Sequence, residues 1–246
     1  IFKDVFVNPA ASDTGIPLGV ALFGLHNILG INRDYKGISP FTGPSYTNKD
    51  IESAINSFKG YNVVQENAVD LAVKMLAKNQ IVACHYGRSE MGPRALGNRS
   101  IFMSPLIAEN KDILNSRVKH REAFRPFAPV ILEEYVSEYF EIDRPCPFML
   151  FVPQVRKEKQ PVIPAVTHID GSGRLQTINR NLNPLFYEIL TKFAAVTGVP
   201  VMLNTSFNDN NEPIVESPYD AVKCFIGTNI DALLIDGRIL LVRENI

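Results

Sequence analysis

Residues 86–100 read YGRSEMGPRALGNRS and residues 119–127 read KHREAFRPF, and together they bound the most informative stretch of the chain. Glycines and prolines interrupt it, so we expect much of it to be loop. Its eight cations are Arg88, Arg94, Arg99, Lys111, Arg117, Lys119, Arg121 and Arg125, and its four acids are Glu90, Glu109, Asp112 and Glu122. Arginine side chains on Gly-rich backbone suit phosphate or carboxylate groups, so this stretch is the leading candidate for an anion site.

Composition narrows the class of protein. The chain has 246 residues, 46% of them hydrophobic, enough for one large domain with or without a smaller piece. Its formal net charge of −1 argues against a general binder of nucleic acid or membrane surfaces. No apolar run approaches a membrane span, and the N-terminus lacks a signal-peptide pattern. Three widely spaced cysteines favour a reducing, cytoplasmic setting.

The chain divides into three parts. Residues 1–30 read as a strand, a turn and a helix that cannot bury the strand on both sides, so we predict the end of a preceding domain. The absence of a starting methionine agrees with a fragment of something longer. Residues 31–60 read as a linker and a helix. Residues 61–246 alternate irregularly between strands and helices, which predicts an α/β domain with a mixed sheet and flanking helices.

Hydrophobic periodicity and the residues that start or end helices predict the elements of the third part. Predicted helices cover residues 66–78, 108–118, 133–140, 184–197 and 217–225, after one at 48–58. Predicted strands cover residues 81–84, 100–103, 128–132, 148–152, 175–178, 199–203, 232–235 and 239–242. Residues 153–164 are predicted to be an exposed connection. The helix at 184–197 has the clearest end signals, because Asn183 can cap it and Gly198 can end it.

Polar loops at residues 87–99, 168–174 and 204–208 are each expected to follow a strand. On one rim of the sheet they would combine arginine, amide and hydroxyl groups that suit polyphosphate. The chain has no Walker A sequence and no G-x-G-x-x-G after a strand, so a nucleotide site would need another architecture. Arginines that only form surface or structural ion pairs remain the alternative at this point.

Single residues allow two interpretations each. Lys119 and Arg125 can hold phosphoryl oxygens and neutralise a leaving group, or they can pair with nearby glutamates. Residues 204–208 can bind a ligand or form an ordinary turn. His168 has no third partner spaced for a metal site, which favours a structural role. Asp13 can coordinate a metal or cap the helix that follows, and the residues alone favour the cap.

Four ordered blocks resemble O-carbamoyltransferases of the nodulation-protein and cephamycin/tobramycin-biosynthesis type. They read GRSEMGPRALGNRS (87–100), LNSRVKHREAFRPFAP (114–129), PAVTHIDGSGRLQT (164–177) and TGVPVMLNTSFN (197–208), the last followed by EPIV (212–215). VNPAASDTG (7–15) is similar to the final motif of the family's first domain. Two residues depart from the family pattern: Asn8 stands where many relatives have histidine, and Asn211 where glycine is expected.

The resemblance implies a two-domain enzyme. Residues 1–30 would be the C-terminal remnant of an actin-like (ASKHA-type) carbamoyl-transfer domain that holds a divalent metal such as iron. Residues 61–246 would be a YrdC-like domain, a twisted mixed sheet that forms carbamoyl-adenylate from carbamoyl phosphate and ATP with Mg²⁺. The upstream domain would then transfer the carbamoyl group to a hydroxyl acceptor that the sequence does not identify. This chain alone would carry only the adenylation half.

The resemblance also assigns roles to individual residues. The catalytic candidates are Lys119, Arg125 and Ser206. The substrate- and nucleotide-binding candidates are Arg94, Arg99, Arg121, His168, Arg174, Asn204, Thr205 and Asn208. Asp13 becomes a metal ligand, Lys111 and Arg117 become helix surface, and Arg88 stays open. The rival hypotheses are a YrdC-type RNA-related role, as in threonylcarbamoylation, and a non-catalytic nucleotide-binding module.

Overall fold

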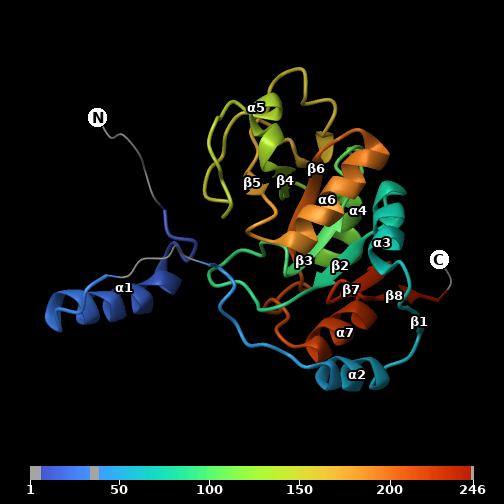
Figure 1. Cartoon of the computed structure of the whole chain (residues 1–246). Coiled ribbons are helices and arrows are strands. Elements are labelled where there is room, and N and C mark those ends of the chain that lie inside the picture. Colours follow the sequence, from blue (N-terminus) through green and yellow to red (C-terminus); the bar gives the residue numbers. More distant parts are fainter. Residues whose placement is uncertain (1–6, 34–38, 245–246) are drawn as a thin grey trace.

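The computed structural model describes residues 7–33 and 39–244. Their centre is one eight-stranded sheet in the order β1-β8-β7-β2-β3-β6-β4-β5 (Figure 1). The strands are β1 Tyr61–Val64, β2 Val82–His85, β3 Arg99–Met103, β4 Ala128–Leu132, β5 Gln176–Ile178, β6 Val201–Ser206, β7 Ala232–Ile235 and β8 Ile239–Arg243. Two neighbouring pairs, β2–β7 and β4–β5, are parallel and the other pairs are antiparallel, so the predicted mixed sheet is confirmed.

Helices cover both faces of the sheet (Figure 1). They are α2 Asn48–Asn56, α3 Ala68–Ala77, α4 Asn110–Leu114, α5 Val136–Tyr139, α6 Pro184–Thr197 and α7 Pro218–Gly227, whereas α1 Ile16–Phe23 lies away from the sheet. The core beneath α3 and α6 includes Val82 and Cys84, whereas Ala83 between them belongs to the core beneath α2 and α7. A strand buried on both faces needs apolar residues at every position, which is why the central strands read as continuous hydrophobic runs.

The predicted helix ends are confirmed where a capping side chain was visible in the sequence. Asn183 Oδ1 accepts a hydrogen bond from Phe186 N at 3.0 Å, and Gly198 ends α6 in the left-handed conformation. Thr47 and Ser217 each form a capping box at the start of α2 and α7. These side chains satisfy backbone donors that have no partner within the helix.

Several element predictions were wrong. Residues 148–152 form no strand, and only Phe151 makes an isolated bridge, with Leu175. The connection at 153–164 is not wholly exposed, because Val155 and Ile163 are buried. The strand β1 was missed, and β6 continues through Ser206 instead of ending at residue 203.

Two predicted helices are shorter and less regular than expected. The one at 108–118 is α4 followed by a π turn, Asn115–Lys119, and the one at 133–140 is a 3₁₀ turn, Glu133–Tyr135, followed by α5. The 3₁₀ turn follows β4 directly, where the chain must leave the strand within a few residues. The predicted strand at residues 5–7 lies largely outside the described residues.

The N-terminal part projects away from the sheet (Figure 1). It consists of a 3₁₀ turn, Asp13–Gly15, then α1 and a π turn, Gly24–Ile28, and none of these three segments has a buried residue. Its large apolar side chains are exposed, for example Val20 at 66% and Ile28 at 71%. Within the described ranges, no helix combines the length and the apolar character needed to cross a membrane.

Candidate functional site

The ends of four strands meet at one rim of the sheet. Because β6 runs antiparallel to β3 and β4, and β5 runs parallel to β4, the C-terminal end of β6 lies beside the N-terminal ends of the other three. The chain segments that enter β3, β4 and β5 carry Arg94, residues 121–127 and Arg174 respectively. The three polar loops of the sequence analysis therefore contribute residues to one rim.

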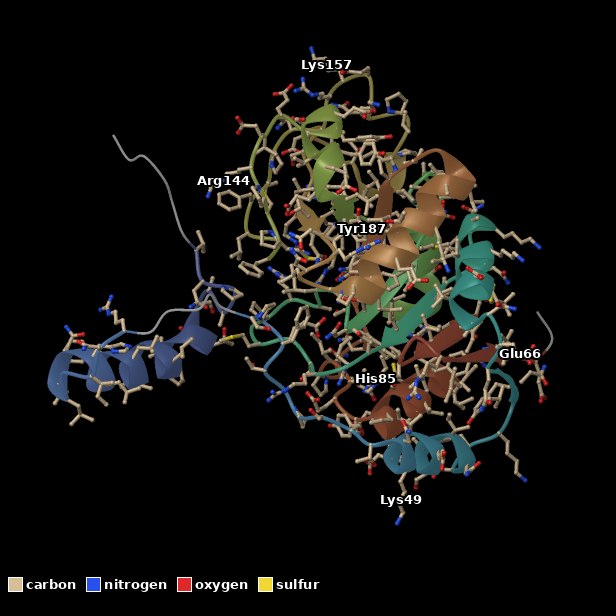
Figure 2. All side chains as sticks on the ribbon, viewed as in Figure 1. Lys49, Glu66, His85, Arg144, Lys157 and Tyr187 are labelled. Atoms are coloured by element: carbon tan, nitrogen blue, oxygen red, sulfur yellow. The ribbon has the colours of Figure 1, made fainter. Side chains whose placement is uncertain are left out.

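A cavity of about 280 Å³ opens at this rim. Its ionisable lining consists of four arginines, and its other polar residues are an amide and two hydroxyls: Arg94, Arg121, Arg125, Arg174, Asn204, Thr205 and Ser206. Among the residues that the structure describes, no aspartate or glutamate lines it. Other charged side chains, such as Lys49, Glu66 and Lys157, point from the periphery into solvent (Figure 2). The cavity lining thus concentrates positive charge at the rim.

Arg174 gives the strongest indication that the cavity binds an anion. Within the described chain, its buried Nε has no hydrogen-bond partner. Burial, and then the charges of Arg94 and Arg121, lower the pKa of Arg174 to about 10. A bound anion would satisfy the free donor and offset the repulsion between the three guanidinium groups.

Arg121 and Arg125 both line the cavity, but their side chains are held to different degrees. The Arg121 guanidinium lies over the Phe127 ring, 4.8 Å from its centroid, and its Nε donates to Asn115 Oδ1 at 2.7 Å. Arg125 is about half exposed and forms an ion pair with Glu122 at 3.1 Å. Arg121 is therefore positioned in advance, whereas Arg125 is held at its Nε by Glu122 and is more exposed.

Lys119 lies beneath the cavity floor and not in its lining. Its Nζ donates to Ser206 O at 2.5 Å, Asn208 O at 2.8 Å and Asn208 Oδ1 at 2.7 Å. Ser206 Oγ donates to the same Asn208 Oδ1 at 2.6 Å. Burial, followed by the charge of Arg121, lowers the pKa of Lys119 to about 7. Lys119 and Asn208 thus hold the end of β6 in place, and Ser206 alone of the three lines the cavity.

The loop that carries Arg94 is folded around the carboxylate of Glu90. Glu90 Oε1 accepts hydrogen bonds from the backbone N–H groups of Leu96 at 2.8 Å, Asn98 at 2.7 Å and Arg99 at 3.2 Å. Burial raises the pKa of Glu90, although these donors oppose the shift. No role for Glu90 is predicted from the sequence, where its only signal is an acid inside a Gly-rich loop.

Two further segments brace this loop from outside. Arg88, left open by the sequence, donates to the carbonyl oxygens of Gly43 at 2.5 Å and Thr42 at 3.0 Å. Gly92 has a φ of 91°, and a Cβ there would lie 2.6 Å from Pro9 O. The linker and the N-terminal turn therefore both contact the loop that presents Arg94.

Arg99 does not reach the cavity, in contrast to the expectation for this residue. Its side chain is fully buried, and its donors go to the carbonyl oxygens of Glu216, Tyr86, Asn98 and Gly87. Its Nη2 also lies 3.5 Å from Glu216 Oε1. Because it is the first residue of β3, its guanidinium is used to hold the surrounding loops and has no donor left for a ligand.

His168 and Asp13 also lie outside the cavity lining. His168 faces Ser172 Oγ at 3.2 Å within a tight turn, and burial lowers its pKa. Asp13 is exposed, and Ser12 Oγ accepts a hydrogen bond from its backbone N–H. The described residues contain no group of three or more His, Cys, Asp or Glu side chains placed to hold a metal. In this part of the chain, then, no metal site accompanies Asp13.

A larger cavity, of about 600 Å³, lies between α2, α3 and the β7–β8 turn. Its cations already have partners: Lys192 pairs with Asp70 and Glu188, and Arg238 pairs with Asp236. A neutralised lining gives no reason to expect an anion there. The smaller cavity at the rim remains the candidate site.

Known proteins align with most of this chain. Residues 73–242 match the family described as carbamoyltransferase C-terminus. Nodulation protein NolNO of Sinorhizobium fredii is 42% identical over 98% of this chain and 36% of its own length. Nodulation protein NolO of Bradyrhizobium diazoefficiens is 43% identical over 96% of this chain and 44% of its own length. The chain thus spans less than half the length of either relative.

One solved structure overlaps the fold more weakly. Full-length HypF, crystallised in its phosphate- and nucleotide-bound form, gives a TM-score of 0.46 at 16% identity, over 75% of this chain and 22% of that one. A TM-score at this level is too low to support an inference about this chain.

Proposed function

Because the chain belongs to the carbamoyltransferase family, whose C-terminal region its residues 73–242 match, we propose that its rim cavity binds carbamoyl phosphate and ATP and forms carbamoyl-adenylate. The observation that carries this proposal is the cavity itself, with four arginines, two hydroxyls and no carboxylate among the described residues that line it. Such a lining suits a small phosphate-bearing substrate. The YrdC-like character of the domain belongs to the same proposal.

The reaction needs two anions side by side. Carbamoyl phosphate would be hydrolysed to carbamate and phosphate, and a carbamate oxygen would then attack the α-phosphorus of ATP as pyrophosphate leaves. Arg94, Arg121 and Arg174 would offset the repulsion between the reactants and the charge on the leaving group. Since no carboxylate among the described residues lines the cavity, Mg²⁺ accompanying ATP would be held through phosphate oxygens and water.

The complete carbamoyl transfer would involve more of the polypeptide than this chain. We propose that an upstream domain accepts carbamoyl-adenylate and passes the carbamoyl group to a hydroxyl acceptor, with the segment around Asp13 belonging to that domain. The divalent metal expected there finds no set of ligands among the described residues, so no step is assigned to it.

The three cysteines are free thiols, in keeping with a reducing, cytoplasmic setting.

Pyrophosphate release tests the proposal directly. The chain should release pyrophosphate from ATP only when carbamoyl phosphate is present. Arg174→Ala and Arg94→Ala should each lower the rate on the order of 10²-fold, because each removes a preorganised charged donor. Arg180→Ala, which removes an exposed arginine outside the cavity lining, is the matched control and should keep the wild-type rate.

Two other results would contradict the proposal. Wild-type rates in Arg94→Ala, Arg174→Ala and Ser206→Ala together would show that the reaction takes place elsewhere. Binding of ATP without any release of pyrophosphate would instead favour a non-catalytic nucleotide-binding module.

A further inference from the structure

Asn204 has an acceptor that the fold leaves unused. It lies within β6, pairs with Phe102 of β3 and Ala128 of β4, and is 1% exposed. It is also part of the cavity lining. Its Oδ1 is buried, and no donor among the described residues reaches it. Buried acceptors without a partner are rare in folded proteins, so this one calls for a functional explanation.

The orientation of the Asn204 amide is fixed by its neighbours. Its Nδ2 donates to Ala95 O at 3.2 Å and to Gln176 Oε1 at 2.7 Å. Gln176 is itself held because its Nε2 donates to Leu96 O at 3.0 Å. A flipped Asn204 amide would place its oxygen against two other acceptors, so Oδ1 must be the atom left over.

Asn204 Oδ1 is a buried amide acceptor in a lining whose other polar side chains are arginines and hydroxyls. The four arginines can only donate, and they select for negative charge in the ligand. An unused amide oxygen beside them selects for an N–H or O–H donor near that charge. A carbamoyl group attached to phosphate has both properties, because its NH₂ group donates while its phosphate carries the charge.

We propose that Asn204 Oδ1 accepts an N–H of the carbamoyl group and thereby distinguishes carbamoyl phosphate from acyl phosphates of the same shape. This inference rests on the proposed function. Gln176 is the positioning residue, because it acts on the ligand only by fixing the Asn204 amide. The arginines provide affinity for the phosphate, and Asn204 provides selectivity for a carbamoyl group attached to that phosphate.

Acetyl phosphate is the matched probe, since it carries a methyl group where carbamoyl phosphate carries NH₂. Calorimetric titration of the chain should show tighter binding of carbamoyl phosphate than of acetyl phosphate by about tenfold or more. Asn204→Leu should bring this ratio close to one while binding inorganic phosphate as well as wild type. Arg94→Ala, as the contrasting variant, should weaken all three ligands and leave the ratio unchanged.

Gln176→Met provides a second, independent variant. It frees the Asn204 amide to rotate without touching the ligand, so the ratio should fall while affinity for inorganic phosphate is kept. A purely structural role for Gln176 would instead lower binding of all three ligands together. This variant decides the question if Asn204→Leu does not fold, as judged by loss of a cooperative thermal unfolding transition.

The outcomes separate the two claims. An unchanged ratio in a folded Asn204→Leu or Gln176→Met variant would overturn the role of Asn204 and leave the proposed function standing. Equal binding of carbamoyl and acetyl phosphate by the wild type would do the same. If the wild type bound neither carbamoyl phosphate nor inorganic phosphate, the proposed function and this inference would fall together.

Discussion

Lys119 and Arg174 are both cations with lowered pKa values, but they serve the site in different ways. Lys119 donates to the carbonyl and amide oxygens of residues 206 and 208, whereas Arg174 Nε has no hydrogen-bond partner among the described residues. The first holds the end of a strand, and the second is available to a ligand. Charge alone therefore does not define the function of a residue at this rim.

Lys119 should leave a measurable signature in the pH dependence of stability. Its pKa is lowered from 10.5 to about 7 by burial, so above pH 7 the unfolded chain binds a proton that the folded chain lacks. Stability should therefore rise between pH 7 and about 8.5, by about 1–2 kcal/mol, before the buried cysteines oppose the trend. Urea titrations across this range should show the rise in wild type and its loss in Lys119→Met.

The groups that oppose this rise at higher pH include Cys84 and Cys224. Burial raises their pKa values from 9.0 to about 12 and about 11, so from pH 9.0 up to these values the folded chain keeps protons that the unfolded chain has lost, and stability falls. If Lys119→Met had the same slope as wild type below pH 8.5, the lysine would not be the group that titrates.

Part of the site was predictable from the sequence at the level of single residues, and part was not. Motif comparison identified all four arginines of the cavity, but it gave Arg99 the same status. The difference is positional: Arg99 begins β3 and turns inward, whereas Arg94 lies in the loop ahead of that strand. Gln176 was missed for a related reason, since an amide in an apolar strand becomes informative only when its partner on another strand is known.

At the scale of elements, the loop at residues 87–99 depends on one carboxylate. Glu90→Ala would leave three backbone N–H groups without their acceptor, so we expect a loss of about 2–4 kcal/mol in the free energy of unfolding, measured in urea. Affinity for inorganic phosphate should fall as well, because the loop carries Arg94.

Glu90→Gln is the matched control for this prediction. It keeps an oxygen at Oε1 and loses only the charge, so it should retain most of the stability that Glu90→Ala loses. If the free energy of unfolding of Glu90→Ala lay within about 0.5 kcal/mol of the wild-type value, the carboxylate would not be the group that organises the loop.

Element predictions succeeded where the signal was local. The caps of α2, α6 and α7 involve side chains within three or four residues of each helix end, so the sequence contains all that is needed. Residues 148–152 are apolar because Phe148 and Met149 pack near Leu96 and Ala128, and burial of this kind requires no ladder. β1 was missed because an edge strand with two exposed residues, Asn62 and Val63, has no continuous hydrophobic run.

At the scale of the whole molecule, the N-terminal part should be dispensable for folding of the sheet domain. In it Pro9 and Ala10 are buried, and they contact Gly92. Removal of residues 1–38 should change the free energy of unfolding by less than about 1 kcal/mol in urea. It should also reduce self-association in light scattering, because it removes an exposed apolar surface.

A slightly longer deletion serves as the comparison. Removal of residues 1–46 also takes away the segment whose Pro40 O accepts from Met91 N at 2.6 Å and whose Gly43 N donates to Ser89 O at 3.1 Å. This chain should be less stable than the one that begins at residue 39. Equal stability of the two chains would mean that the linker does not brace the arginine loop.

The order of strands in the sheet has a consequence for synthesis on the ribosome. β7, at residues 232–235, lies between β2 and β8, and β8 in turn is the partner of β1. Early strands at one side of the sheet therefore wait until β7 and β8 have been translated. Until then β2 has an unpaired edge and β1 has no neighbour, which exposes both to wrong pairing and to chaperones. The arginine-rich rim, built from earlier strands, can assemble before the sheet is closed.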